Sequence, residues 1–175
     1  MHIALILFFI VLAPVLSGAY GAIYDMIIFT FAPEFFTDYR FAQFELSGKM
    51  TPIIGAGIIG FANSWKVGIP VGIILGGLCY MHKNIQKTFR YMIISYGIVI
   101  LAAITASTFA LLLMRNQLSE NVYLGTDQGL QKTVEIIINM NNFAYAGALI
   151  GTACACAWQV YIILKKTEKK INLKA

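Results

Sequence analysis

The distribution of hydrophobic and polar residues along the chain predicts four membrane-spanning helices. Four long apolar segments lie at about residues 3–23, 60–81, 91–114 and 143–164. Each is long enough to cross a hydrocarbon core of about 30 Å as an α-helix. The runs are continuous, whereas the strands of a membrane barrel are short and alternate in polarity. The pattern therefore predicts an all-α membrane protein, a four-transmembrane-helix bundle that forms a single membrane domain over residues 1–175.

The first span is expected to be a retained anchor. A cleaved signal peptide is the alternative, because small residues near Ser17–Gly21 would suit cleavage. However, the segment lacks the positively charged region that precedes the apolar part of such a peptide.

The second span lies within Pro52–Tyr80, a stretch longer than one untilted span needs, with Lys66 near its middle. Two interpretations remain open at this point. Either one tilted helix carries Lys66 toward a polar bundle interior, or a short amphipathic piece precedes a span over Val67–Met81. Small residues spaced by four allow a second helix to approach closely. We expect that helix to belong to the same chain, and a helix of another subunit is the alternative. The small residues are Gly68, Gly72 and Gly76.

The charges between the spans predict the orientation of the chain. The segment 24–50 has four acidic and two basic residues, and the segment 115–142 has three acidic and two basic residues. The connection between the second and third spans has three basic residues and no acidic one, and the C-terminal tail has five lysines against one glutamate. Positively charged segments remain in the cytoplasm. We therefore expect a membrane protein with both termini cytoplasmic and with outer loops at 24–50 and 115–142.

Composition supports a lipid environment and argues against a nucleic-acid partner. Hydrophobic residues make up 59% of the chain and charged residues 12%, about half the charged share of a soluble domain. The net charge of +5 comes from residues beside apolar segments, so a membrane lipid surface is the expected partner. The three cysteines lie inside apolar segments, where a structural role is expected. They are Cys79, Cys154 and Cys156.

The first outer segment is strongly aromatic and predicts a short amphipathic helix. Pro33 suits the first position of a helix, and Glu34 suits its first turn. The rings that follow would serve a helix that lies flat at the membrane interface as a lid or brace. The alternative is that Asp25 and Glu34 converge at the mouth of the bundle as ligands or proton carriers. The rings belong to Phe36, Tyr39, Phe41 and Phe44.

The second outer segment predicts another short amphipathic helix, which leads into the fourth span. Asn139, Asn141 and Asn142 crowd the junction with that span. Hydrogen bonding across helices is the expected reason for them, and a polar binding pocket is the alternative. The residues at helical spacing are Val134, Ile137, Ile138 and Asn141.

Several short stretches resemble a known family. They are Tyr24-Asp25, Ala32-Pro33-Glu34-Phe35-Phe36-Thr37, Arg40-Phe41, Gln43-Phe44, the region Trp65–Gly76 and Asn142-Phe143-Ala144-Tyr145-Ala146-Gly147. Together they resemble an uncharacterised family of four-span bacterial integral membrane proteins, whose first outer loop carries His-Asp and then Pro-Glu-aromatic-Phe. The resemblance covers most of the chain and implies a fold without an activity. It indicates Asp25, Glu34, Asn142 and Tyr145 as candidate binding residues.

The sequence departs from the family pattern at two positions. The pattern has a histidine before the Asp and another before the Asn, and this chain has Tyr24 and Asn141 there. Histidine and carboxylate together would suit a transition metal, whereas tyrosine and asparagine are poorer ligands. The two histidines of the chain, His2 and His82, lie elsewhere. We therefore predict no metal and no cofactor.

Three functions remain open, and no catalytic residue is assigned. The sequence has no Cys-x-x-Cys, Gly-x-Ser-x-Gly or His-Glu-x-x-His motif, which favours a non-enzymatic scaffold or accessory subunit. Such a protein would form a homo-oligomer or bind a partner membrane subunit. The second function is an oligomeric transport or channel module in which Lys66, Asn63 and the asparagines at 139–142 line a polar path. The third is an outer-leaflet membrane enzyme that uses Asp25 and Glu34.

Overall fold

The computed structural model describes residues 2–46, 48–82, 84–122 and 127–172, and every regular element among them is helical. Two short elements, η1 (Phe35–Arg40) and α2 (Phe41–Gln43), connect the first two long helices. Four helices are long and apolar enough to cross a membrane, so the prediction of an all-helical chain with four such helices is confirmed. The long helices are α1 (His2–Phe31), α3 (Pro52–Cys79), α4 (Ile85–Val122) and α5 (Asp127–Asn172).

The helices are longer than the apolar pattern predicts. Helix α1 does not stop at residue 23 but continues to Phe31, because the sequence between residue 23 and Pro33 contains no proline or glycine. Helix α5 joins the expected amphipathic segment and the fourth span without a break. Residues 123–126 of the predicted outer loop 115–142, and the last three residues of the lysine-rich tail, lie outside the described residues. The candidate spans are Ile3–Phe31, Pro52–Cys79, Ile85–Met114 and Gln131–Lys165.

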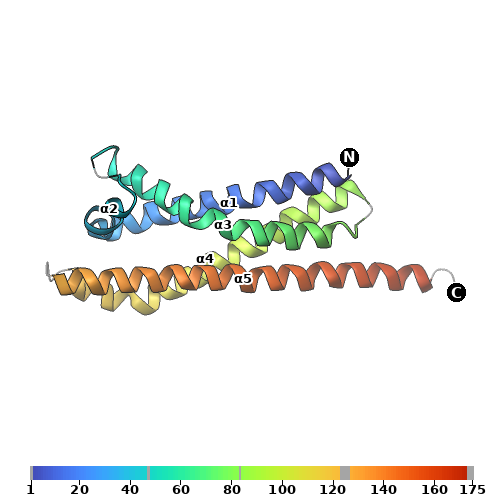
Figure 1. The fold of residues 1–175 in the computed structure, drawn as a ribbon. Helices are drawn as coiled ribbons and strands as arrows, with labels where there is room; N and C mark the ends of the chain where they lie inside the picture. Colours follow the sequence, from blue (N-terminus) through green and yellow to red (C-terminus); the bar gives the residue numbers. More distant parts are fainter. Residues whose placement is uncertain (1, 47, 83, 123–126, 173–175) are drawn as a thin grey trace.

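Helix α3 is one continuous helix, and it packs mainly against α1 (Figure 1). Of the two interpretations of Pro52–Tyr80, the structure therefore shows the unbroken helix. A Cβ atom at Gly68 would meet the backbone of Ala13 and Pro14, and one at Gly72 would lie 2.8 Å from the Ala13 Cβ. These glycines, and Gly76 one turn later, thus lie against a helix of the same chain, and their missing side chains allow the close approach.

Helices α4 and α5 form a second close pair. A Cβ atom at Gly147 would lie 2.5 Å from the Cβ of Ala106, and one at Gly151 would lie 2.8 Å from that of Ala102. Helix α4 crosses behind α3 at an angle, as Figure 1 shows, and the contacts between the two pairs are sparser than those within each pair. Spaces therefore remain between the pairs.

The first outer segment packs inward at the end of the bundle. Phe35, Phe36 and Phe41 are buried, and they form a cluster with Ile59 of α3 and Ile137 of α5. The expectation that the rings of Phe36 and Phe41 lie at the membrane interface is therefore wrong. Their burial is favoured because each ring removes a large apolar surface from water.

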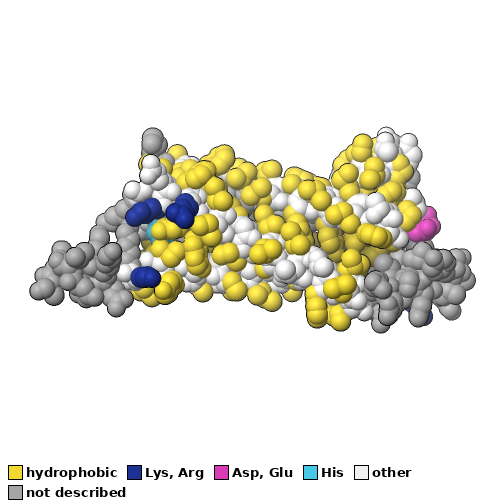
Figure 2. Space-filling view, turned by 180° about the vertical axis from the view of Figure 1, so that it is seen from behind, with side chains coloured by type: hydrophobic (Ala, Val, Ile, Leu, Met, Phe, Trp, Pro, Cys, Tyr) yellow, Lys and Arg dark blue, Asp and Glu magenta, His cyan; other side chains and the backbone are white. Residues whose placement is uncertain are grey.

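The surface between the two ends of the bundle is largely hydrophobic (Figure 2). Lys and Arg side chains gather near the end where α1 begins, and acidic side chains are visible at the opposite end. Large apolar residues are exposed on this surface, among them Val11, Leu101 and Leu149, with exposed fractions of 63–69%. A surface of this kind is suited to hydrocarbon.

Candidate functional site

A small polar cavity lies between the helix pair α1–α3 and helix α5. Its volume is about 20 Å³, which is room for one water-sized particle. We refer to it as the Asp25 cavity. Its polar lining side chains belong to Tyr20, Tyr24, Asp25, Asn63, Ser64, Asn141 and Tyr145.

Asp25 is the charged group of this cavity, and only 6% of it is exposed. Its position depends on two glycines, because the backbones of Gly21 and Gly60 touch where α1 crosses α3. A Cβ atom at Gly60 would lie 2.8 Å from the Asp25 Cβ. No described residue forms a hydrogen bond or close ion pair with the carboxylate, although the charge of Arg40 acts on it electrostatically. The carboxylate is therefore buried without a direct protein partner among the described residues.

The two tyrosines of α1 contribute stacked rings and two hydroxyl groups. Their ring centroids are 6.0 Å apart and their planes differ by 20°. The Tyr20 hydroxyl shares a 3.3 Å hydrogen bond with the Ser107 hydroxyl of α4. The Tyr24 hydroxyl is buried and has no hydrogen-bond partner in the described part of the chain. The cavity thus holds two buried polar groups, Asp25 and Tyr24, whose bonding capacity is unused.

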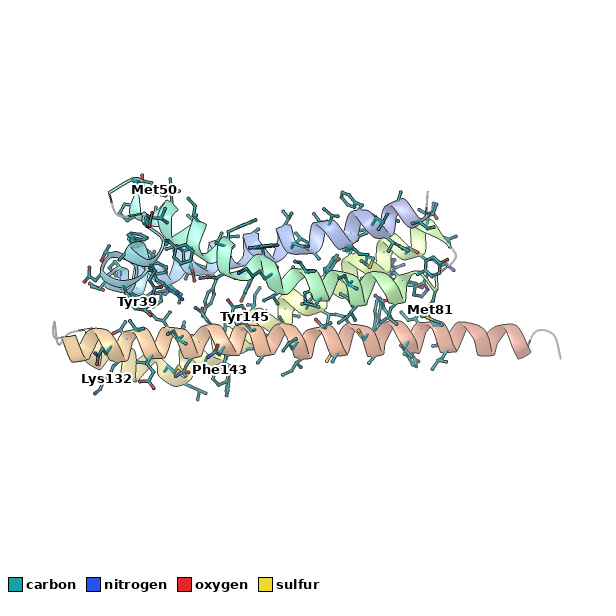
Figure 3. All side chains as sticks on the ribbon, viewed as in Figure 1. Tyr39, Met50, Met81, Lys132, Phe143 and Tyr145 are labelled. Atoms are coloured by element: carbon teal, nitrogen blue, oxygen red, sulfur yellow. The ribbon has the colours of Figure 1, made fainter. Side chains whose placement is uncertain are left out.

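Helices α3 and α5 complete the lining. On α3, Ser64 is held beside α1 by a 2.7 Å hydrogen bond that the Ser17 hydroxyl donates to its carbonyl oxygen. On α5, Asn141 and Tyr145 are four residues apart and share one face. Figure 3 shows Tyr145 on the side of α5 that faces the α1–α3 pair.

The structure brings together two of the predicted binding residues, Asp25 and Tyr145. Glu34 and Asn142 are exposed, and neither lines the Asp25 cavity. Asp25 and Glu34 therefore do not share this cavity, and the acid–base pair expected for an outer-leaflet enzyme gains no support.

Lys66 is exposed on the outer face of α3 and does not line the Asp25 cavity. The expectation that a continuous helix carries it into a polar bundle interior is wrong, because Gly68 and Ser64 occupy the face of α3 that packs on α1. Asn63 does line the cavity. The polar path of a transport module would need both residues on the same side of the helix.

The sequence hypotheses contained four of the seven polar lining residues. Asp25 and Tyr145 were candidate binding residues, and Asn63 and Asn141 belonged to the predicted polar path. They missed Tyr20, Tyr24 and Ser64, because no motif marks these three as site residues. The position of Asn141 one helical turn before Tyr145 could have linked the separate hypotheses.

A larger apolar groove lies on the other side of the two tyrosine rings. It runs between α1 and α4 and has a volume of about 520 Å³, within the range of small-molecule sites. Tyr20 and Tyr24 line both spaces and so form the wall between them. The apolar lining includes Ala19, Ile23, Ile27, Phe31, Ile100 and Ile104.

A second polar cluster, near the other end of the bundle, is fully paired. The Gln159 side-chain amide donates a 2.7 Å hydrogen bond to the Ser95 hydroxyl. The Cys79 thiol donates to the Gln159 carbonyl oxygen over 3.4 Å. All three residues are buried, so this cluster links α3, α4 and α5 from within. Cys154 and Cys156 are free thiols at more accessible positions on α5.

Nothing in the described part of the chain forms a metal centre of three or more His, Cys, Asp or Glu residues. Comparisons of the chain with protein-family models, with curated proteins and with solved structures found no match.

Proposed function

We propose that this protein is a non-enzymatic accessory subunit of the bacterial inner membrane that binds a helix of a different membrane subunit. The binding surface is the outer face of α3 around Lys66. The observation that carries the proposal is the exposure of this lysine at mid-length of a helix of membrane-spanning character.

The depth of Lys66 follows from the contacts of its neighbours on α3. Ser64 accepts a hydrogen bond from Ser17, and Gly68 lies against Ala13. Lys66 is therefore level with the part of α1 between Ala13 and Ser17, near the middle of the candidate span Ile3–Phe31. In a bilayer, this level corresponds to the hydrocarbon core.

A lysine at the centre of a membrane helix is unfavourable by about 2.5–3.5 kcal/mol on insertion scales. Charges at this depth generally pair with an opposite charge or face a polar cavity. Lys66 does not line the Asp25 cavity or the α1–α4 groove. A carboxylate on a neighbouring membrane helix would compensate the lysine and fix the register of the two helices.

The surroundings of Lys66 suit helix docking. Apolar residues recur at intervals of three or four along this face, which gives a continuous stripe. The stripe includes the ring of Trp65, and aromatic residues are enriched at protein interfaces. Its members are Ile58, Ala62, Trp65, Ile69 and Ile73, of which the four large residues are each at least 37% exposed. The nearby ring of Phe61 packs against Gly18 of α1 instead.

A second copy of the chain does not supply the carboxylate. Of the eight acidic residues in the sequence, Asp25 is the one well inside a candidate span, and it is buried. Glu135 also belongs to a candidate span but lies near its outer end. The partner is therefore a different membrane protein that has Asp or Glu at the depth of Lys66.

The proposed setting is the bacterial cytoplasmic membrane with both termini in the cytoplasm. The apolar surface between the two ends of the bundle supports contact with lipid, and the basic end near the start of α1 supports a cytoplasmic N-terminus (Figure 2). Membrane lipid then covers the remaining exposed faces.

Site-specific photo-crosslinking in living cells tests the proposal. A photoreactive residue replaces Ile69 on the docking face, and a control replaces Ile150, which is 63% exposed on α5. We expect one discrete adduct from position 69 and none from position 150. The crosslinked peptide should come from a membrane helix that contains Asp or Glu.

The lysine is then varied in the same cells. Lys66→Leu should abolish the adduct because the charge pair is lost, and Lys66→Arg should retain it because the charge is kept. An adduct that survives Lys66→Leu, or equal adducts from positions 69 and 150, would refute the proposal.

A further inference from the structure

We infer that the Asp25 cavity binds one dehydrated sodium ion. The inference rests on a buried carboxylate and several neutral oxygen-bearing side chains that surround a space of one-particle size. It does not depend on the partner proposed for Lys66, which lies on another face of α3.

The buried carboxylate requires compensation. Moving an ionised carboxylate out of water without hydrogen bonds or a counter-charge has a large free-energy cost. Asp25 receives no hydrogen bond from the described residues, and the hydroxyl of neighbouring Tyr24 is also unpaired there. Whatever occupies the cavity must therefore interact with both groups.

The chemistry of the lining suits a hard cation. Hard metal ions are bound by carboxylate, amide-carbonyl and hydroxyl oxygens. Asn63 and Asn141 offer amide oxygens, and Ser64 and Tyr145 offer hydroxyl oxygens. Among the residues that the structure describes, no lysine, arginine or histidine lines the cavity. Because these donors come from α1, α3 and α5, a bound cation would hold the three helices together.

Size and charge point to sodium. A cavity of about 20 Å³ holds a single particle, so the ion must enter without its hydration shell. A monovalent cation neutralises the one carboxylate, whereas a divalent ion would leave excess positive charge in a site where Arg40 already contributes positive potential. The small volume favours sodium over the larger potassium ion.

Thermal unfolding of the purified full-length protein in detergent tests the inference. Trp65 and Trp158 provide the fluorescence signal, and sodium chloride is titrated against choline chloride at constant ionic strength. A ligand that binds the folded state raises the unfolding midpoint as its concentration exceeds the dissociation constant. We expect a saturable rise with sodium, a smaller one with potassium and none with choline. Radioactive sodium should bind at about one ion per chain.

Matched variants locate the effect. Asp25→Asn should abolish the sodium-dependent rise, whereas Glu34→Gln, which changes an exposed carboxylate outside the cavity, should leave it unchanged. Ser64→Ala keeps the helix contact and removes one oxygen donor, so it should shift the half-maximal response to higher sodium. If Asp25→Asn does not fold, the sodium response of Ser64→Ala tests the inference in its place.

Three results would overturn the inference. The first is an equal response to sodium and choline. The second is a full sodium response in Asp25→Asn or an unshifted one in Ser64→Ala. The third is a midpoint that follows pH and ignores sodium, which would mean that the carboxyl is held in its protonated form.

Discussion

The rings of Tyr20 and Tyr24 stack on successive turns of α1, with their centroids 6.0 Å apart. One side of this stack lines the polar Asp25 cavity, and the other lines the apolar groove between α1 and α4. The two spaces differ sharply in chemistry but share a wall of two side chains. The occupancy of each space can therefore be tested separately, by substituting residues that line one space and not the other.

The groove is expected to hold a lipid acyl chain. Its volume of about 520 Å³ suits a chain-like molecule better than an α-helix, whose diameter is about 10–12 Å with side chains. Ala19→Trp places a large ring in the groove and should strongly reduce crosslinking to a lipid that carries a photoreactive acyl chain. The yield of protein–lipid adduct in proteoliposomes measures the effect.

Val15→Trp is the matched control for the groove. Val15 lies one turn before Ala19 on α1 and is 51% exposed, but it does not line the groove. Its crosslinking yield should equal that of the unmodified protein. An equal loss in both variants would indicate a general effect of the added ring and contradict occupancy of the groove.

Any side chain at Gly60 should destabilise the contact between α1 and α3. A Cβ atom there would lie 2.7 Å from the carbonyl carbon of Gly21, whereas one at Gly77 would meet nothing within 4 Å. Gly60→Ala should therefore lower the free energy of unfolding by about 1–3 kcal/mol, as overpacking does. Gly77→Ala should raise it by up to about 1 kcal/mol because alanine favours the helix. Denaturant titration in mixed micelles measures both, and the opposite order would contradict the predicted packing.

The buried hydrogen bond from Gln159 to Ser95 should be visible as a coupling energy. A double-mutant cycle with Gln159→Leu and Ser95→Ala is expected to give about 0.6 kcal/mol, the average for hydrogen bonds between membrane helices, and at most about 1.7 kcal/mol. Thr105 provides the control, because its exposed hydroxyl bonds only to carbonyls of its own helix. The cycle of Gln159→Leu with Thr105→Ala should be additive. Equal coupling in both cycles would argue against the bond.

The two ends of the bundle should be accessible from opposite sides of a sealed vesicle. Asp38→Cys and Lys87→Cys place thiols at exposed positions of the two ends, in a background with Cys154→Ala and Cys156→Ala. In spheroplasts, an impermeant maleimide should label position 38 only, because positive segments remain in the cytoplasm. Position 87 should react only after the membrane is opened. Labelling of both positions in intact spheroplasts would contradict the proposed orientation.

The sequence alone indicated the class of fold, because a run of apolar residues long enough for a membrane helix is a local property. The four helices and the small-residue stripe at Gly68, Gly72 and Gly76 could both be read from it. Helix ends were less predictable. Asp25 looked like the start of a loop, but a polar residue remains helical when neighbouring helices cover it, and α1 continues to Phe31.

The site depended on tertiary structure. Asp25 and Tyr145 were named from the sequence, yet their common cavity requires α1, α3 and α5 to meet where Gly21 and Gly60 bring two backbones together. The direction of Lys66 was likewise decided by which face of α3 packs on α1. Hydropathy and loop charge are properties of individual residues, so they can be calculated from the sequence without knowledge of the packing. The choice between neighbouring polar residues, such as Asn141 in the cavity and Asn142 outside it, depends on helix rotation, which is set only when the helices pack.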